Sequence, residues 1–324
     1  MQKLDMRVAV DAMGGDFAPD VVIKGSLLAS EEVNKNTKIV LIGQEEAVRT
    51  AFSQQNQPIP SNIEIIDAPD FIEMGENPIK ALQKKPKSSI SVGYNLLKNK
   101  QVDAFCSAGN TGAMMVGAMF SVQLIPGIIR PVIMAYVPKV SGEKGIILDV
   151  GANTDCKPDI LAQFAQLGSL FCQHVLKIPV PRVGLINLGE EEEKGNLAVK
   201  EAHKLLTNHK HIEFVGNIEG RGIFLDKADV LVCDGFVGNV VVKMAESMFD
   251  IIKKLGISNE FFDDFNSDVV GASPILGVNG NVIVAHGASN DLAIKNMILL
   301  GQQITESNIT EEIRESFIVE SSVK

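Results

Sequence analysis

The stretch IILDVGANTDCKPDILAQFAQLGSLFCQHV, at residues 146–175, contains the unit from which the fold is predicted. A short apolar run ends in Asp149, a turn rich in Gly, Asn and Asp follows, and a helical pattern begins near Pro158. Proline suits the first turn of a helix, because its missing N–H would have no partner there. The pattern at 158–175 is apolar nearly all round, which indicates a helix that is central or lies in a subunit interface.

The same order, a short β-branched run and then a longer helical pattern, recurs along the chain. It predicts a mostly parallel sheet with helices on both faces. We therefore expect an α/β protein with a three-layer α/β/α architecture. We expect one domain, 1–324, because no linker, repeat or low-complexity tract divides the chain. The expected strands are 7–10, 38–42, 63–66, 103–106, 146–149, 182–187, 212–215, 230–233 and 282–285.

The composition excludes several classes of protein. Of 324 residues 45% are apolar, too many for a disordered chain. The net charge of −10, with no Trp and two Tyr, argues against a nucleic-acid-binding surface. Four Cys without regular spacing form no disulfide framework, and no secretory signal is visible. The apolar run 113–125 is too short to span a membrane and predicts a buried helix, so we expect a soluble protein.

Six expected strands run out into Gly, Asn and Asp. In a parallel sheet these ends lie along one edge, where ligands bind, and the N–H groups at helix starts favour anions. The alternative is that Gly and Asn simply form tight turns, but six such turns on one edge favour a shared anionic or polar ligand. The six segments are VAVDAMGGD (8–16), AFCSAGNTGA (104–113), IILDVGANTD (146–155), GLINLGEEE (184–192), VLVCDGFVGN (230–239) and VIVAHGAS (282–289).

Three residues are candidate catalytic groups. Asn110 either caps a helix or donates to a phosphate or an oxyanion. Lys157 either neutralises an anion or is a surface lysine. His286 ends a strand at the crevice edge, unlike the other four histidines. The candidate substrate-binding residues at the same strand ends are Asp11, Gly14, Gly15, Ser107, Gly109, Thr111, Asp149, Asn153, Asn187, Asp234 and Asn239.

Several common site patterns are absent from the sequence. No GxGxxG follows a strand, and there is no P-loop, HExxH, CxxC or GxSxG. Cys156 has no base close in sequence, so we expect no nucleophilic thiol. Arg182 precedes its strand and is expected at the far edge, in a structural role. Five aspartates either hold Mg²⁺ or cap helices and order turns, and we expect no metal: Asp11, Asp16, Asp149, Asp155 and Asp234.

Eight blocks of sequence follow one another from about residue 6 to about residue 297: VDAMGGDFAPD (10–20), MGENPIKALQKKPKSS (74–89), CSAGNTGA (106–113), LDVGANTDCKPD (148–159), NLGEEEEKGN (187–196), FVGNIEGR (214–221), CDGFVGNVVVK (233–243) and GVNGNVIVAHGAS (277–289). In this order they resemble the bacterial phosphate acyltransferases, the acyl-carrier-protein:phosphate acyltransferases of phospholipid synthesis. The resemblance implies that acyl phosphate is made from acyl-carrier protein and inorganic phosphate. It implies no cofactor and no covalent acyl-enzyme.

The resemblance also implies a fold like that of isopropylmalate dehydrogenases and phosphotransacetylases. It implies a cytoplasmic homodimer whose product feeds a membrane glycerol-3-phosphate acyltransferase. Segment 253–270 is shorter than the family's helical hairpin, which is associated with dimer contacts and membrane docking, so at most a peripheral contact with the inner face of the membrane is expected. Gly75 replaces the usual acidic residue of an MDExP-like block, in which Glu76 and Pro78 remain.

Acyl-carrier proteins are acidic, as is this chain, so a local basic patch is expected to guide docking. The densest run of lysines is KALQKKPKSS, with Lys84, Lys85 and Lys87 as the docking candidates beside Lys80. The alternative is a solvated loop. Two other functions would use the same crevice: a phosphotransacetylase that acts on acyl-CoA, and a non-catalytic acyl- or phosphate-binding protein.

Overall fold

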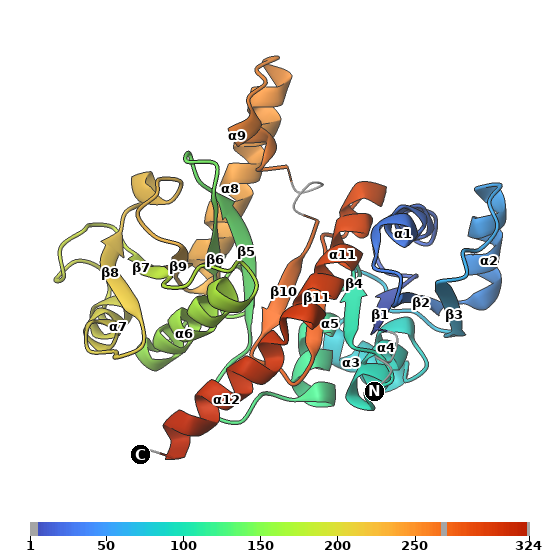
Figure 1. The fold of residues 1–324 in the computed structure, drawn as a ribbon, viewed down its shortest axis with the longest axis horizontal. Coiled ribbons are helices and arrows are strands. Elements are labelled where there is room, and N and C mark those ends of the chain that lie inside the picture. Colours follow the sequence, from blue (N-terminus) through green and yellow to red (C-terminus); the bar gives the residue numbers. More distant parts are fainter. Residues whose placement is uncertain (1–5, 267–270, 323–324) are drawn as a thin grey trace. The chain divides into compact units, whose positions relative to one another are not determined.

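The computed structural model describes residues 6–266 and 271–322, which form two compact units. Within these ranges, unit 1 comprises residues 6–124 and 271–306, and unit 2 comprises residues 125–266 and 307–322. Each unit is a strand-and-helix structure in its own right (Figure 1). The expectation that 1–324 is a single domain stays a prediction.

Unit 1 has a six-stranded sheet in the order β3-β2-β1-β4-β11-β10. Neighbouring strands are parallel except β10 and β11, which pair antiparallel. The strands are β1 (Met6–Asp11), β2 (Thr37–Gly43), β3 (Ile63–Asp67), β4 (Ala104–Ser107), β10 (Ser273–Leu276) and β11 (Asn281–Val284). The helices are α1 (Asp20–Glu32), α2 (Glu45–Gln54), α3 (Pro78–Lys84), α4 (Ser89–Lys98), α5 (Thr111–Gly117), the π-helix η1 (Ala118–Val122) and α11 (Asp291–Ser307).

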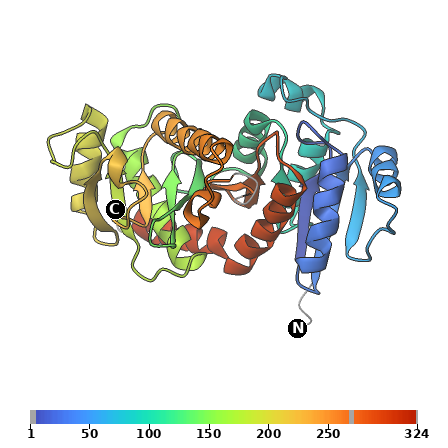
Figure 2. The same cartoon turned by 90° about the horizontal axis from the view of Figure 1, so that it is seen from above.

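Strand β4 shows why helices cover both faces of this sheet. Successive side chains of a strand point to opposite faces. Phe105 points towards α4, where its ring lies against Gly93, while the Cys106 thiol points towards Gly301 of α11. Helices α1 and α11 lie side by side on the second face (Figure 2), and Gly25 of α1 lets α11 approach closely. The three-layer prediction is therefore confirmed within unit 1.

Unit 2 has a five-stranded sheet in the order β5-β6-β9-β7-β8, parallel except for the antiparallel pair β5 and β6. The strands are β5 (Val132–Pro138), β6 (Lys144–Leu148), β7 (Arg182–Ile186), β8 (Glu213–Ile218) and β9 (Val230–Val232). The helices are α6 (Pro158–His174), α7 (Leu197–Thr207), the 3₁₀ turn η2 (Gly220–Gly222), α8 (Gly235–Lys254), α9 (Glu260–Asp263) and α12 (Ile309–Ser322).

Helix α6 is central to unit 2, as its apolar sequence predicts. Ten of its 17 residues are buried. It packs on β6 and β9 and contacts α7 and α12, and Gly168 allows the side chains of Leu148 and Val230 to approach its backbone. The opposite face of this sheet carries Ile147 and Leu231, which pack with Val237 and Val241 of α8. Unit 2 therefore also has three layers.

All nine expected strands are present, and each of their ends lies within three residues of the predicted position. The sequence pattern missed β5 and β10, the two strands that pair antiparallel with a strand close by in sequence. Each is followed by another strand instead of a helix, and a pattern of alternating strands and helices therefore does not predict either one. The buried helix predicted at 113–125 is wrong in part: the helical run ends at Val122, and Phe120 is 72% exposed.

Two expectations from the sequence concern the cysteines and the apolar segments. All four cysteines are free and buried, including Cys106 and Cys233, as predicted. Over residues 6–266 and 271–322, every helix is too short or too polar to cross a membrane.

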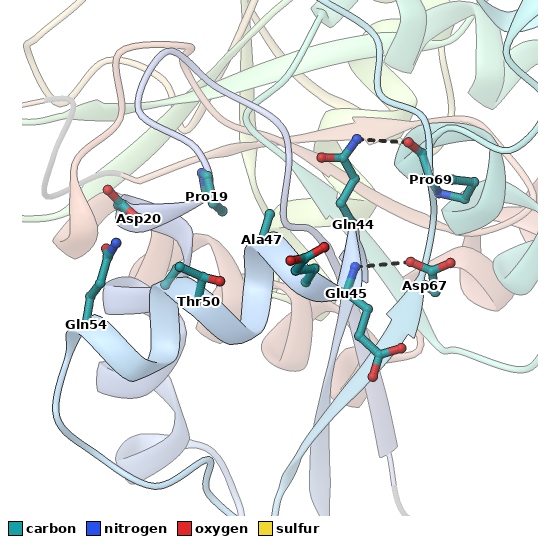
Figure 3. A pocket seen from close by; sticks show the side chains of 11 residues that line it. Pro19, Asp20, Gln44, Glu45, Ala47, Thr50, Gln54, Asp67 and Pro69 are labelled. Carbon is teal, nitrogen blue, oxygen red and sulfur yellow. Dashed lines mark hydrogen bonds between the residues drawn. The ribbon is translucent and has the colours of Figure 1, made fainter.

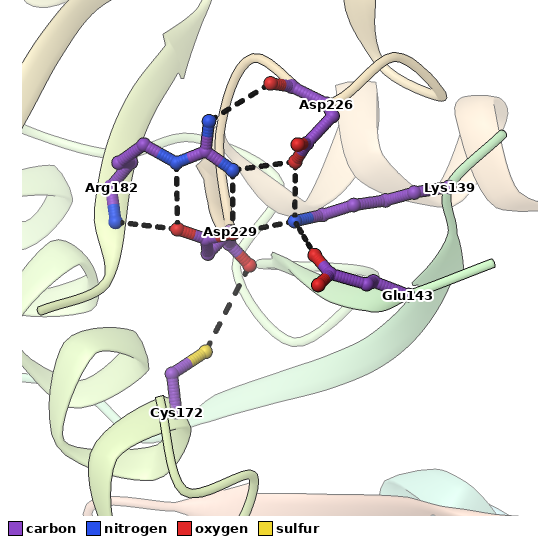
Figure 4. Close-up of polar contacts among 6 residues, drawn as sticks. All are labelled: Lys139, Glu143, Cys172, Arg182, Asp226 and Asp229. Carbon is purple, nitrogen blue, oxygen red and sulfur yellow. Dashed lines mark hydrogen bonds and ion pairs between the residues drawn. The ribbon is translucent and has the colours of Figure 1, made fainter. Parts of the chain in front are cut away.

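Arg182 takes part in an ion-pair cluster at the amino ends of β6, β7 and β9, as its predicted structural role requires (Figure 4). Its backbone N–H and Nε donate to Asp229 at 2.8 and 3.0 Å. The ammonium of Lys139, 2% exposed, pairs with Asp229 and, at 3.1 Å, with Asp226. Burial alone would raise the pKa of Asp229, but hydrogen bonds from Arg182 and Lys139 outweigh it and lower the pKa from 3.8 to about 2.

We expect Asp229→Asn to lower the free energy of unfolding at pH 7 by about 3 kcal/mol, because removal of one partner leaves the Lys139 charge buried. The stabilisation by the Asp229 carboxylate is fully present above its unfolded pKa of 3.8 and is lost as the pH falls towards 2. The difference in free energy of unfolding between wild type and Asp229→Asn, measured by urea unfolding, should therefore become smaller below pH 4. Asp226→Asn, at a half-exposed position, should cost less. Equal losses for the two variants would contradict this account.

Candidate functional site

A buried carboxylate joins the turns after β1 and β4 in unit 1. Asp11 accepts hydrogen bonds from the Ser107 hydroxyl (2.7 Å) and the N–H of Met13 (3.1 Å). Ser107 in turn accepts one from the N–H of Gly109 (2.9 Å). Burial raises the pKa of Asp11, although these donors oppose the rise. A Cβ on Gly14 would fall 2.4 Å from the Asp11 carboxylate, so the turn requires glycine there.

The turn after β11 joins the same group of turns. The N–H of Asp16 donates to the carbonyl of Gly287 at 2.8 Å. Gly15 has a φ of +107°, a conformation that favours glycine. His286 directly precedes Gly287, and its side chain is exposed. The structure therefore places His286 at the carboxyl edge of the unit 1 sheet, beside the Asp11 turn, as the sequence indicated.

The Asn110 side chain is fully occupied with ordering the backbone. Its Oδ1 accepts the N–H of Ala113 at 2.9 Å and so caps α5. Its Nδ2 donates to the carbonyls of Glu73, Met74 and Glu76 at 3.0–3.1 Å. The capping alternative is thus the one that the structure shows, and the side-chain amide is not free to donate to an oxyanion. A catalytic part for Asn110 stays a prediction, and it would act by positioning.

A second buried carboxylate orders the turn after β6 in unit 2. Asp149 accepts the N–H groups of Gly151, Ala152 and Asn153 at 3.1, 3.1 and 2.6 Å. It also accepts the side-chain amide of Asn153 at 2.9 Å. Burial raises the pKa of Asp149, and the donors oppose the rise. The Asn153 amide donates its other proton to the carbonyl of Pro131.

The start of α8 is built onto this turn. The N–H of Gly235 donates to the carbonyl of Asn153 at 2.7 Å. The side chain of Asn239 donates to the carbonyl of Val150 at 3.0 Å, and Asp234 caps the helix through the N–H of Val237. Because β6 and β9 are parallel neighbours, α6 and α8 both begin at one edge of the sheet. Two helix N-termini are therefore close together there, an arrangement that favours an anion.

Two exposed cations lie by this turn. Lys157 directly precedes α6, and Arg130 directly precedes the strand-leading Pro131. Neither makes an ion pair within residues 6–266 and 271–322. Burial, with Asp149, Asp234 and Asp155, raises the pKa of Cys156 to about 12, and only the positive charge of Arg130 opposes the rise. The Cys156 thiol is therefore protonated at neutral pH.

Most buried candidates thus order turns and are not free to touch a ligand with their side chains. Asn187 also orders its own loop, because its amide donates to the carbonyl of Lys194. Asp11 and Asp149 accept backbone N–H groups of their own turns, and Asp234 caps α8. In the described part of the chain, no three His, Cys, Asp or Glu side chains are grouped as a metal site requires. The exposed candidates are Thr111 and His286 in unit 1 and Lys157 in unit 2.

Arg130 is the residue that the sequence search missed. It stands in front of a strand, whereas the search considered the turns that follow strands. No local sequence signal marks Arg130, because the contact that places its neighbour Pro131 at the site, the amide of Asn153 on the Pro131 carbonyl, joins residues 22 apart in the chain. In unit 2, Asp149, Asn153 and Asn239 are connected through one turn, whereas Asn187 contacts only its own loop and β8. That the candidates of both units form one site stays a prediction.

An open pocket of about 680 Å³ lies elsewhere on the carboxyl edge of the unit 1 sheet, after β2 and β3 (Figure 3). Its turn is held by Glu45, whose N–H donates to Asp67 at 3.1 Å, and by Gln44, which donates to the carbonyl of Pro69. Four carboxylates line it: Asp20, Glu45, Glu46 and Asp67. Their charge repels phosphate, so the pocket is unsuited to the predicted substrate.

The fold is similar to that of two solved phosphotransacylases. A phosphotransacetylase from Streptococcus pyogenes matches with a TM-score of 0.63 at 17% identity, over 93% of this chain and 94% of that one. A branched-chain phosphotransacylase from Enterococcus faecalis V583 matches with a TM-score of 0.62 at 12% identity, over 93% and 99%. The chain therefore has the α/β fold of the phosphotransacylases, as predicted.

Sequence comparison gives the family. The profile described as "Fatty acid synthesis protein" matches residues 6–268. The phosphate acyltransferases of Salinibacter ruber and Halothermothrix orenii are each 40% identical to this chain, over 96% of it and 97% and 98% of their own lengths. The chain belongs to the phosphate acyltransferase family and is an acyltransferase.

Proposed function

We propose that the protein makes acyl phosphate from acyl-[acyl-carrier-protein] and inorganic phosphate, for phospholipid biosynthesis. The observation that carries the proposal is a pair of exposed cations that make no ion pair in the described part of the chain, Lys157 and Arg130, beside the N-termini of α6 and α8. Positive charge and helix N-termini together favour a phosphate anion. The family of the chain supports the same substrate.

The proposed reaction needs no covalent acyl-enzyme. A phosphate oxygen attacks the thioester carbonyl carbon and forms a C–O bond. The C–S bond then breaks, and the thiolate leaves with the electron pair. The thiol of the carrier has a pKa near 8.5 if it behaves like cysteine, so it leaves without strong acid help. The high pKa of Cys156 argues against a protein thiol as nucleophile.

In this proposal the protein contributes mainly position and charge. Lys157 and Arg130 hold the phosphate beside the turn backbone at 151–153, at the starts of α6 and α8. The exposed imidazole of His286 is an optional acid or base. Asn110 keeps the α5 turn in place. No cofactor takes part.

The test is to offer acyl-[acyl-carrier-protein] and acyl-CoA separately with ³²P-labelled phosphate and to separate the products by thin-layer chromatography. We expect labelled acyl phosphate from the carrier-protein thioester. Label from acyl-CoA alone would identify a phosphotransacetylase, and binding without turnover of either thioester would identify a non-catalytic protein.

We expect Lys157→Ala to lower turnover by about 10²–10³-fold, the usual cost of removing one preorganised charge or donor at a developing oxyanion. The matched control is Lys144→Ala, an exposed lysine at the opposite, amino end of β6. Circular dichroism of both variants should match wild type. If Lys157→Ala is folded and turns over like wild type, the phosphate site lies elsewhere.

The docking surface for the acidic carrier is proposed on α3 and the turn that follows it. Lys80, Lys84 and Lys87 are exposed there and make no ion pair in the described structure. Lys85 differs from the prediction, because its ammonium already pairs with Glu76. Three free positive charges remain to attract an acidic surface.

We expect Lys84→Glu combined with Lys87→Glu to raise the Michaelis constant for acyl-carrier protein several-fold at low salt. The effect should fade as ionic strength approaches the physiological range, where exposed charges are screened beyond about 8–10 Å. The turnover number should change little, since the patch lies outside the chemistry. An unchanged Michaelis constant at low salt would move the docking surface to another face.

We also propose that the protein is a homodimer through α8. Six apolar side chains, each 49–69% exposed, recur every three or four residues on one side of the helix and its end: Phe236, Val240, Met244, Met248, Ile251 and Leu255. A continuous apolar stripe of this length on a helix is typical of an interface. Residues 267–270 of the segment 253–270 lie outside the described residues. Contact of the protein with the membrane, or with the membrane glycerol-3-phosphate acyltransferase, stays a prediction. A monomer in sedimentation velocity would contradict the dimer.

A further inference from the structure

Lys85 directly follows α3, and its ammonium contacts the turn at 71–77, whereas Lys80, Lys84 and Lys87 around it are exposed. We propose that Lys85 is a positioning residue: it holds the turn at residues 71–77 against the start of α5 and so fixes one wall of the active site. The proposal rests on the function proposed above. It is carried by a continuous set of contacts that runs from the Lys85 ammonium to the α5 turn.

The first contacts are those of the ammonium. Lys85 Nζ donates to the carbonyl of Phe71 at 3.0 Å and pairs with the Glu76 carboxylate. It also lies 6.0 Å from the centre of the Phe71 ring, within reach of a cation–π attraction. Only about a third of the Lys85 side chain is exposed. All of these partners belong to the turn at 71–77, so the charge of Lys85 is engaged there and not offered to a docking partner.

The next contacts close the turn on itself. The Glu76 carboxylate that pairs with Lys85 also accepts the N–H of Glu73 at 3.0 Å. The N–H of Glu76 donates back to the carbonyl of Glu73 at 3.2 Å. The hydrogen bond from Lys85 is the main cause of a lowered pKa for Glu76, which keeps this carboxylate ionised and bound. Lys85 therefore orients the group that closes the turn.

The last contacts connect the turn to the site. Asn110 donates to the carbonyls of Glu73, Met74 and Glu76 in this turn, through the same side chain that caps α5. Pro78 lies against Gly112 in the first turn of α5, and the methyl of Met74 lies against Gly287, next to His286. A shift of the turn would therefore displace both Thr111 and His286, the two exposed candidates of unit 1.

The test compares Lys85→Met with Lys24→Met, which removes an exposed charge from α1 in the same unit. We expect Lys85→Met to lower the turnover number about 10–100-fold, because misplacement of about 1 Å has costs of that order. The loss should be the same at low and high salt, and Lys85→Arg should restore most of it, since guanidinium also reaches a carboxylate and a carbonyl. Lys24→Met should leave turnover unchanged.

A second variant, Glu76→Gln, and a second measurement, hydrogen exchange, test the same contact independently. Glu76→Gln retains the size of the side chain and should reproduce the loss, and the double variant should be no worse than Lys85→Met alone, because both act through one contact. Hydrogen exchange needs no activity: the amides of residues 73–77 and of Ala113 should exchange faster in Lys85→Met than in Lys24→Met.

These outcomes separate this inference from the proposed function. If wild type makes no acyl phosphate, the proposed function fails, while the exchange data still decide whether Lys85 orders the turn. Wild-type exchange and wild-type turnover in Lys85→Met would overturn the inference. So would a rise only in the Michaelis constant for acyl-carrier protein that salt abolishes, because that result would make Lys85 a docking charge.

Discussion

The buried carboxyl group of Asp149 is the constraint on which the carboxyl edge of the unit 2 sheet depends. Three consecutive N–H groups and one side-chain amide converge on it. A buried carboxyl group is costly unless its oxygens are hydrogen-bonded, and these donors, with the N–H of Ile133 at 3.3 Å, satisfy the Asp149 oxygens. Because the turn is fixed in this way, α8 can begin directly on it through Gly235, and Gly238 can pack on the Asp149 backbone. Asp11 plays the corresponding part in unit 1.

The sequence was a good guide to the parallel part of the fold for a simple physical reason. A parallel strand must be followed by a crossover, so each one repeats the same run of apolar residues, turn and helix. Strands β5 and β10 pair through short hairpins and lack that signature. The prediction for 113–125 failed at its end for a different reason. Apolar residues alone cannot show that Met119 and Phe120 are left at the surface of a π-helix.

The site was harder to predict, because polar residues at strand ends have two uses that look alike in sequence. Asn110, Asn153 and Asn239 occur where ligand-binding residues occur, yet their amides hold carbonyl groups of neighbouring turns. Lysines are ambiguous in the same way: Lys84 and Lys85 are adjacent in sequence, but only Lys85 is turned inwards. Long-range contacts decide such cases, and no local pattern encodes them.

The order of the chain through the two units also bears on how the protein is made. Unit 1 is assembled from residues 6–124 and 271–306, and β4 pairs with β11, Ala104 opposite Asn281. On the ribosome, at about 5–20 residues per second, β4 therefore waits roughly 10–35 s for its partner strand. During that time it presents an unpaired, apolar edge, the kind of surface that recruits other chains. All of unit 2 up to residue 266 is synthesised in the interval, while this edge of β4 still lacks its partner strand.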